Sequence, residues 1–462
     1  MRHPAPASLR ELLALAVPLI ISQSVMTVQL SLDRILLTWN GNESVAAAMP
    51  AVMLFATVLG LFGQTVHYAS VFVSQYLGAG RPHEIGPVVW QAMWVALASG
   101  AVVLLLSPLS GAIFHLTGHA PEVAEKEAEY FRLLCYAAPA SLITTVVGAY
   151  FAGQGRTWLV LLLSATGVAV NAPLAYAWVV GAWGFPVLGI TGAGYATIAG
   201  STASAALGLL LLIFNPQWRE HRLRKGLRLD VPLLRRLLYF GIPNGLIHLV
   251  DTAAWTAFVF LVGSMSKLES AATNIAFTIN LVAFLPLNGL GQGVEILVGK
   301  RQGEERPDLS ERTTWLGLRV GLLYAGAVSA LYIALPGVFL WAFKYGADAN
   351  QWAELEPIIR TLLVFVGVYT LADTCNIVLS FALRGAGDTK YVALMAVGLA
   401  WPCMVIPTYF AVQFGWGVYG AWVCATVYIA VLATGFVLRF RGGRWRTMKV
   451  IEPRIDEREP AL

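Results

Sequence analysis

The feature that most constrains this chain is a series of apolar runs of about 20 residues or more, repeated from one end of the sequence to the other. A helix of about 20 apolar residues is long enough to cross the hydrocarbon core of a bilayer. Hydrophobic residues make up 57% of the 462 residues and charged residues 12%, whereas soluble domains carry about 25% charged residues. The pattern predicts an all-α polytopic membrane protein without a separate soluble domain.

Twelve of these runs are predicted to be helical spans. They cover 9–39, 45–77, 86–114, 124–154, 157–181, 188–214, 234–263, 269–302, 311–342, 353–386, 389–412 and 417–438. The first run lacks a small-residue cleavage site, so we expect a membrane span there rather than a secretory signal. Ser8 and Glu11 have the spacing of a capping box at its start.

Basic residues are concentrated in every second loop. The poorly basic loops contain only Lys267 and Lys344. The basic set is Arg2, Arg10, Arg81, Arg156, the stretch from Arg219 to Arg236, Lys300, Arg301, Arg306, Arg384, Lys390 and the stretch from Arg439 to Lys449. Such alternation follows the positive-inside rule and predicts a multi-pass protein of a bacterial inner (plasma) membrane with both termini in the cytoplasm. A nucleic-acid-binding face would not alternate in this way, although the net charge is +5.

The two halves of the sequence resemble each other. Pro18 and Pro243, Gly78 and Gly303, and Arg81-Pro82 and Arg306-Pro307 all stand at one constant interval. We therefore expect two six-helix lobes, 1–222 and 223–462, joined by a basic linker around 215–233. Because six is even, both lobes enter the membrane from the same side, related by a pseudo-two-fold axis along the membrane normal. Two such lobes make a monomer sufficient, and in transporters they hold the substrate between them.

Polar side chains inside the spans mark candidate sites, because a charge at mid-span costs about 2.5–3.5 kcal/mol. Helical spacing puts members of each set on one face of their helix. The sets are Asn244, His248 and Asp251 in span 7; Asn288, Gln292 and Glu295 in span 8; Tyr369, Asp373 and Asn376 in span 10; and Gln29 and Asp33 in span 1.

The acids of the second half have no acidic counterparts in the repeat. Asp251, Glu295 and Asp373 correspond to Met26, Ser70 and Ser141, and Asp33 corresponds to Phe258. We infer an acidic cluster confined to the C-terminal half. Intramembrane carboxylates are stabilised by a proton, a metal cation or a cationic substrate, and competition among these ligands would produce an antiporter.

A structural interpretation of the same residues stays open. Interhelical hydrogen bonds are worth about 0.6 kcal/mol on average and occur in membrane proteins without function. Glu295 lies near Lys300, His248 is more typical of a hydrogen-bonding partner than of a ligand, and Asp33 precedes Arg34, with which it could form a local ion pair.

Several segments carry a family resemblance over nearly the whole chain. They are Leu32-Asp33-Arg34, VSQYLGAGRP (73–82), NAPLAYAWVVG (171–181), LGITGAG (188–194), LVGKRQGEERP (297–307) and LRGAGDT (383–389). With these segments the sequence resembles the multidrug and toxic compound extrusion (MATE) family. The resemblance implies export of amphipathic, often cationic organic compounds by alternating access, driven by inward Na⁺ or H⁺.

Within that family the chain is most similar to NorM-like members. Those proteins have an acid in span 7 and another in span 10 after a Tyr one turn earlier, which match Asp251, Asp373 and Tyr369. The span-7 acid is often Glu in that branch and is Asp here. DinF-like members have an Asp four residues after the span-5 Asn, whereas here Asn171 is followed by Ala175.

The resemblance thus implies cation coupling at Asp251, Asp373, Tyr369 and Glu295, with Asp251 and Asp373 as metal ligands if the ion is Na⁺. The substrate cavity or a second cation site would use Asp33, Asn171, Gln29, Asn244, His248 and Asn376. We expect the transported Na⁺ or H⁺ in place of a resident cofactor, and the bilayer and a small organic cation as partners.

Three other functions compete with this interpretation of the sequence. An intramembrane protease is poorly supported, because the GxGD motif at Gly385–Asp388 lies in a basic loop. A flippase for a lipid-linked precursor of the same superfamily would need buried cations for a pyrophosphate, and only Arg34 and Arg132 fit that need. A non-transporting scaffold would not need an acidic cluster in one half.

Overall fold

The computed structural model describes residues 6–40, 42–116, 118–223, 225–345 and 348–452, and within them the regular structure is entirely helical. Arg2 and both chain termini, which the charge pattern assigns to the cytoplasm, lie outside these ranges. The expected twelve spans are confirmed. They run over Leu9–Trp39, Ala47–Gly78, Pro82–His115, Pro121–Gly153, Thr157–Val180, Ile190–Ile213, Val231–Gly263, Lys267–Gly303, Pro307–Ala334, Asn350–Ala386, Thr389–Gln413 and Gly417–Arg441.

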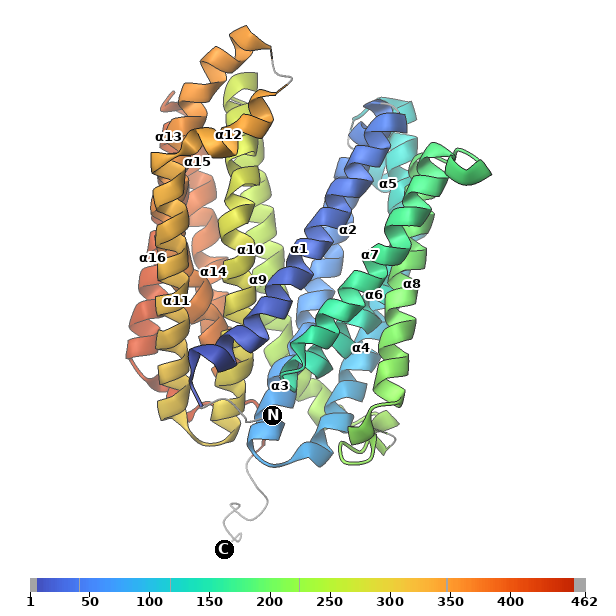
Figure 1. Ribbon diagram of the computed structural model, residues 1–462, viewed down its shortest axis with the longest axis vertical. Coiled ribbons are helices and arrows are strands. Elements are labelled where there is room, and N and C mark those ends of the chain that lie inside the picture. Colours follow the sequence, from blue (N-terminus) through green and yellow to red (C-terminus); the bar gives the residue numbers. More distant parts are fainter. Residues whose placement is uncertain (1–5, 41, 117, 224, 346–347, 453–462) are drawn as a thin grey trace, which may run out of the picture. The chain divides into compact units, whose positions relative to one another are not determined.

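Figure 1 shows the helices in chain order. The first half contains α1 (Leu9–Asn40), α2 (Asn42–His67), α3 (Ala69–Gly78), α4 (Ile85–Leu106), α5 (Ser110–His115), α6 (Pro121–Gly153), α7 (Thr157–Val180) and α8 (Ile190–Ile213). The second half contains α9 (Val231–Gly263), α10 (Lys267–Gly303), α11 (Pro307–Ala334), α12 (Pro336–Lys344), α13 (Ala349–Ala386), α14 (Thr389–Ala400), α15 (Ile406–Gln413) and α16 (Gly417–Arg441). Short turns are η1 (Pro82–Glu84), η2 (Ser107–Leu109), η3 (Ala182–Gly184), η4 (Pro216–Trp218), η5 (Lys225–Leu227), the π-turn η6 (Trp401–Val405) and η7 (Arg444–Thr447).

Proline decides where one expected span is interrupted. The apolar run 311–342 was predicted as a single helix, but α11 ends at Ala334 and a separate helix, α12, begins at Pro336. Leu335 between them has φ −131° and ψ 49°, outside the helical region. Proline has no N–H to donate and disfavours the helical conformation in the residue before it, so the run breaks at this point.

The expected capping box at the start of α1 is present, with one difference. The Ser8 hydroxyl accepts a hydrogen bond from the Glu11 backbone N–H at 3.3 Å. The Glu11 carboxylate accepts from the N–H of Ala7 at 2.8 Å, one residue before the position of the standard box.

Contacts divide the chain into two units, and two of the three borders between them fall inside the helices α1 and α9. Unit 1 comprises the chain up to Ile20 together with Leu249–Lys449, and unit 2 comprises Ile21–His248 together with the chain from Val450. These units do not coincide with a division at residue 222, because the first parts of α1 and α9 each pack in the unit of the other half.

Glycines permit the close packing that places the first parts of α1 and α9 in these units. In unit 1 a Cβ at Gly289 of α10 would lie 2.8 Å from the backbone N of Ile20 in α1. In unit 2 a Cβ at Gly245 of α9 would lie 2.3 Å from the carbonyl oxygen of Leu61 in α2. Both distances are shorter than any side chain tolerates, so glycine is required for these close helix contacts.

The linker after α8 is folded onto unit 2. The Asn215 amide donates to the Tyr150 hydroxyl at 2.8 Å, and that hydroxyl hydrogen-bonds with Nδ1 of the buried His221, also at 2.8 Å. The N–H of Gly86 donates to the His221 carbonyl at 2.9 Å. The linker is therefore a packed part of unit 2, continuous with the first half of α9.

Each unit has one central helix, and the two central helices correspond in the repeat. In unit 2, α6 packs against α2, α4, α7 and α8, and in unit 1, α13 packs against α10, α11 and α16. The central parts of both helices are largely buried. Spans 4 and 10 are therefore equivalent in the internal repeat, and each is the central helix of its bundle.

Candidate ion and substrate sites

Two carboxylates from distant spans lie in the same part of unit 1. Asp251 is half-buried in α9 and Asp373 is 9% exposed in α13. The Tyr428 hydroxyl of α16 donates to Oδ1 of Asp251 at 3.4 Å, and the Asn376 amide donates to Oδ1 of Asp373 at 3.0 Å. The two carboxylates are close enough for their charges to act on each other and on Tyr428. We call Asp251, Asp373, Asn376 and Tyr428 the unit 1 acidic cluster.

Aromatic side chains lie next to this cluster, since Trp255 hydrogen-bonds with Asp251. Tyr369, one turn before Asp373, is 4% exposed, and its ring lies 6.1 Å from that of Trp422. Trp422 stacks on Phe277 at 5.1 Å, and Phe277 meets Trp255 edge-on at 5.6 Å. An aromatic wall lowers the local dielectric and presents faces that attract organic cations.

Within the described ranges, no cationic side chain forms an ion pair with either of the two aspartates. Among the described residues neither Asp251 nor Asp373 forms an ion pair, although other buried acids of the chain do. The cluster supplies carboxylate, hydroxyl and amide oxygens, which are the donor types that hard cations prefer. It contains two acids, and no group of three or more His, Cys, Asp or Glu gathers elsewhere in the described chain. The arrangement fits a proton or one monovalent cation better than a tightly held transition metal.

Glu295 lies in the same unit but has a different environment. Its carboxylate is 3.8 Å from Nε of Arg384, and both side chains are buried. A Cβ at Gly385 would lie 2.5 Å from the Glu295 carbonyl oxygen, so α10 and α13 are in close contact there. The sequence pointed to Lys300 as a partner, whereas the structure supplies Arg384 from another helix.

A second polar group lies in unit 2. Asp33 of α1 is 8% exposed, and its Oδ1 has no hydrogen-bond partner within the described residues. Its charge acts on Tyr130, which hydrogen-bonds with Thr197. Asn171 of α7 is fully buried, and its amide reaches the Thr197 hydroxyl at 3.5 Å. We call Asp33, Tyr130, Asn171 and Thr197 the unit 2 polar cluster.

The alternative of a local ion pair between Asp33 and Arg34 is not supported. The Arg34 guanidinium is exposed and donates to the sulfur of Met49 at 2.8 Å, and no pair with Asp33 forms. Gln29 is half-buried, one turn before Asp33.

The polar face predicted on α9 is divided between the units. Asn244 belongs to unit 2, where its amide donates to the Gln64 carbonyl at 2.7 Å. His248 also belongs to unit 2 and lies against Gly60, at which a Cβ would be 2.2 Å from Nε2. Asp251 comes three residues later in unit 1. The three residues share a helix face, and the border between the two units falls on α9 between His248 and Leu249.

Tyr428 and Tyr130 are the site residues that the sequence did not reveal. Tyr428 lies in an almost wholly apolar stretch of span 12, and Tyr130 was not singled out in span 4. A single tyrosine in an apolar run gives no signal in one sequence, because tyrosine is common both in helix cores and at membrane interfaces.

Comparison with known proteins matches this architecture. The family model MatE matches residues 18–177 and 246–410. A probable multidrug resistance protein NorM of Bradyrhizobium diazoefficiens is 29% identical, covering 93% of this chain and 92% of its own. A protein of the same name from Rhizobium meliloti is 28% identical over 90% of each chain. A crystal structure of MATE in complex with MaL6 superposes with a TM-score of 0.86 at 19% identity, covering 95% of this chain and 97% of the other.

Proposed function

This chain belongs to the MatE family, and from that premise we propose that it exports amphipathic cationic organic compounds in exchange for Na⁺ or H⁺. It is a multi-pass membrane transporter and not an enzyme. The relatives named as probable multidrug resistance proteins support a drug-like cargo. We place the protein in a bacterial inner membrane with both termini in the cytoplasm, on the basis of the alternating loop charges.

The observation that carries the proposal is the unit 1 acidic cluster. Asp251 and Asp373 lie in one cluster, next to Trp255 and the buried Tyr369, and within the described chain neither forms an ion pair. Two such carboxylates repel each other, and a bound cation relieves that repulsion. A proton, Na⁺ or an organic cation can each do so, so the ligands compete and their binding is coupled reciprocally.

In this mechanism the driving ion enters from outside and binds at Asp251 and Asp373. Its binding favours the outward-open state, in which the drug leaves. Release of the ion to the cytoplasm leaves the two carboxylates without a bound cation. This favours binding of another drug molecule. Alternating access through movement of two bundles is the general mechanism of transporters with such repeats.

The remaining polar residues take different roles. We assign the unit 2 polar cluster, with Gln29, to the substrate cavity or a second cation site, because Asp33 and Asn171 both carry an unpartnered oxygen within the described chain. Asn244 and His248 belong to the same unit, and we assign them to the same substrate cavity or second cation site. Glu295 is charge-compensated by Arg384, so we assign ion coupling to the two aspartates and helix contact to Glu295.

Dye transport in vesicles tests this assignment. Purified protein is reconstituted, loaded with a fluorescent cationic dye, and given a Na⁺ gradient alone or a pH gradient alone. The Asp251→Asn and Asp373→Asn variants should lose gradient-driven transport while remaining folded. Glu354→Gln is the matched control, because Glu354 is an exposed acid on α13, the helix that also carries Asp373.

Each outcome has a definite meaning. Transport driven by Na⁺ places a Na⁺ site at the aspartate pair, and transport driven only by the pH gradient makes the pair a proton carrier. Normal transport by both aspartate variants would disprove the coupling role. Absence of dye movement under either gradient would instead favour flipping of a lipid-linked precursor.

A further inference from the structure

A groove on unit 1 lies between the start of α1 and the first half of α11. It has a volume of about 500 Å³. Its lining includes Ala7, Asp308, Glu311, Arg312, Trp315 and Arg319. All of these residues belong to unit 1, and none belongs to the acidic cluster described above.

Two arginines in the groove have no polar partner among the residues that the structure describes. Arg312 and Arg319 are exposed, and neither forms a hydrogen bond or an ion pair with any described residue. They stand seven positions apart in the sequence, which is about two helical turns, so they lie on the same face of α11, with Trp315 between them. Their positive charges are therefore available to a ligand.

The acids that line the groove are already compensated. Asp308 is paired with Arg306 at 3.0 Å, and Glu311 with Arg446 at 2.7 Å. The groove therefore has a surplus of positive charge, contributed by Arg312 and Arg319.

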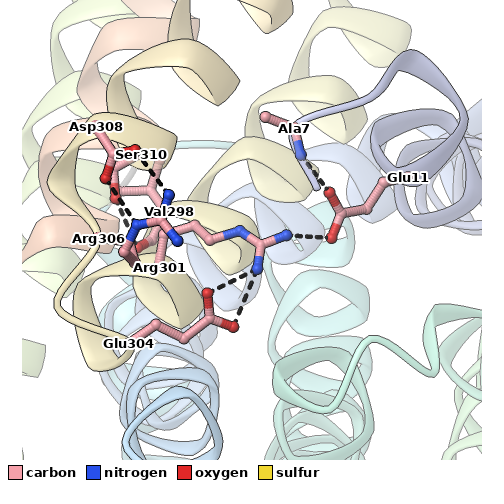
Figure 2. Close-up of polar contacts among 8 residues, drawn as sticks. All are labelled: Ala7, Glu11, Val298, Arg301, Glu304, Arg306, Asp308 and Ser310. Atoms are coloured by element: carbon pink, nitrogen blue, oxygen red, sulfur yellow. Dashed lines mark hydrogen bonds and ion pairs between the residues drawn. The ribbon is translucent and has the colours of Figure 1, made fainter. Parts of the chain in front are cut away.

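The wall beside the groove is fixed by a separate ion-pair network, drawn in Figure 2. Arg301 binds Glu11 at 2.6 Å and Glu304 at 2.7 Å, and Glu11 also accepts the N–H of Ala7 at 2.8 Å. These bonds hold Ala7 at the rim of the groove. The charges of Glu11 and Arg301 compensate each other within this network. Neither residue competes for a ligand in the groove.

Arg319 lies deep in the span for a charged, exposed residue. Arg319 comes more than three helical turns after Pro307, the first residue of α11. This corresponds to about 18 Å along the helix axis. A charge there costs about 2.5–3.5 kcal/mol on insertion scales. An arginine in this position reaches toward the interface, where lipid phosphates are found.

From these observations we propose that the groove binds one anionic phospholipid. Its phosphate accepts hydrogen bonds from the Arg312 and Arg319 guanidinium groups, whose planar forks suit phosphate oxygens. Its acyl chains follow the apolar surface of α11 beside Trp315 and Leu316. The charge surplus favours an anionic headgroup over a zwitterionic one. The proposal rests on the membrane placement of α11 and not on the transported substrate.

Native mass spectrometry of the full chain in detergent tests the site. The probes are palmitoyl-oleoyl phosphatidylglycerol and, for comparison, phosphatidylcholine with the same chains. We expect one retained phosphatidylglycerol per chain, with affinity reduced about 10- to 100-fold in the Arg312→Gln/Arg319→Gln double variant. The Arg312→Lys/Arg319→Lys variant keeps the charge and should retain most of the binding.

Arg235→Gln is the matched control, because Arg235 is an exposed arginine on α9 in unit 2, outside the groove. Its phosphatidylglycerol binding should equal that of the unmodified chain. The proposal is overturned if the double glutamine variant retains the lipid, if Arg235→Gln loses it equally, or if phosphatidylcholine binds as well. Displacement of the lipid by excess inorganic phosphate would also overturn it, by showing a site for free phosphate. Because the protein is in detergent, none of these results depends on its orientation or on transport.

Discussion

At the scale of single residues, the three acids of the second half differ in how their charge is balanced. Within the described chain, Asp251 and Asp373 have hydrogen-bond donors, among them Tyr428 and Asn376, and no ion pair. Glu295 has the Arg384 guanidinium at 3.8 Å. A buried acid with a fixed cationic partner does not gain from binding a further cation, whereas an uncompensated pair does.

This difference predicts that Glu295 acts on stability. Glu295→Gln leaves Arg384 buried without its counter-charge and should lower the free energy of unfolding by about 3–5 kcal/mol. The Glu295→Gln/Arg384→Gln double variant removes both charges and should recover a large part of that loss. Unfolding of the purified protein in detergent, followed by tryptophan fluorescence, measures both effects.

Glu305→Gln serves as the control for this pair. Glu305 is exposed and binds Lys449 at the surface, so its loss should change stability little. If Glu295→Gln is as stable as the unmodified chain while dye transport is lost, Glu295 belongs to the coupling site after all.

The sequence could predict part of the candidate site at this scale. Asp251 and Asp373 stood out because a charge in an apolar span is costly and must be offset by something. Tyr428 and the partner of Glu295 did not stand out, because both contacts join helices far apart in the chain. Helical spacing relates residues on one helix and gives no information about which helix lies opposite.

At the scale of elements, the helix ends follow the sequence closely. Span limits were expected from hydropathy alone, and most agree with the structure to within four residues. The exception is the break at Pro336, where a continuous apolar run hid a helix boundary. Hydropathy measures whether a segment prefers lipid, and proline determines whether its backbone can stay helical.

Packing of α9 against α2 leads to a prediction about two glycines. At Gly245 a Cβ would lie 2.3 Å from the backbone oxygen of Leu61, and at Gly60 it would lie 2.2 Å from the His248 ring. Gly245→Ala should therefore destabilise the protein by about 1–3 kcal/mol, because the clash is with a backbone oxygen, which no second substitution can remove. Gly60→Ala should also destabilise, but His248→Ala in the same chain should restore most of the loss.

The melting temperatures of these variants check the prediction. Gly63→Ala on α2 is the control, since nothing lies within 4 Å of the added Cβ. Recovery of Gly245→Ala by His248→Ala would contradict the assignment, as would a Gly63→Ala effect equal to that of Gly245→Ala.

At the scale of the whole molecule, the alternating loop charges predict the orientation in the membrane. The linker 215–230 should face the cytoplasm and the loop between α9 and α10 the outside. Single cysteines at Glu220 and Lys267, both exposed, can be introduced after replacement of Cys135, Cys375, Cys403 and Cys424.

In intact cells a membrane-impermeant maleimide should label Lys267→Cys and not Glu220→Cys. Permeabilisation should make Glu220→Cys reactive as well. The reverse pattern would place the termini outside and would refute the orientation proposed here.

The sequence by itself determined the number of spans, the internal repeat, the charge alternation and the acids that are candidates for a function. These properties are local or periodic, since they depend on apolar length, helical spacing and the cost of charge in lipid. Only the tertiary structure decided that α1 and α9 change unit midway, that Tyr428 donates to Asp251, and that Arg384 balances Glu295. Those outcomes depend on how closely two backbones approach at Gly245, Gly289 and Gly385, and close approach is a property of helix pairs that no single segment encodes.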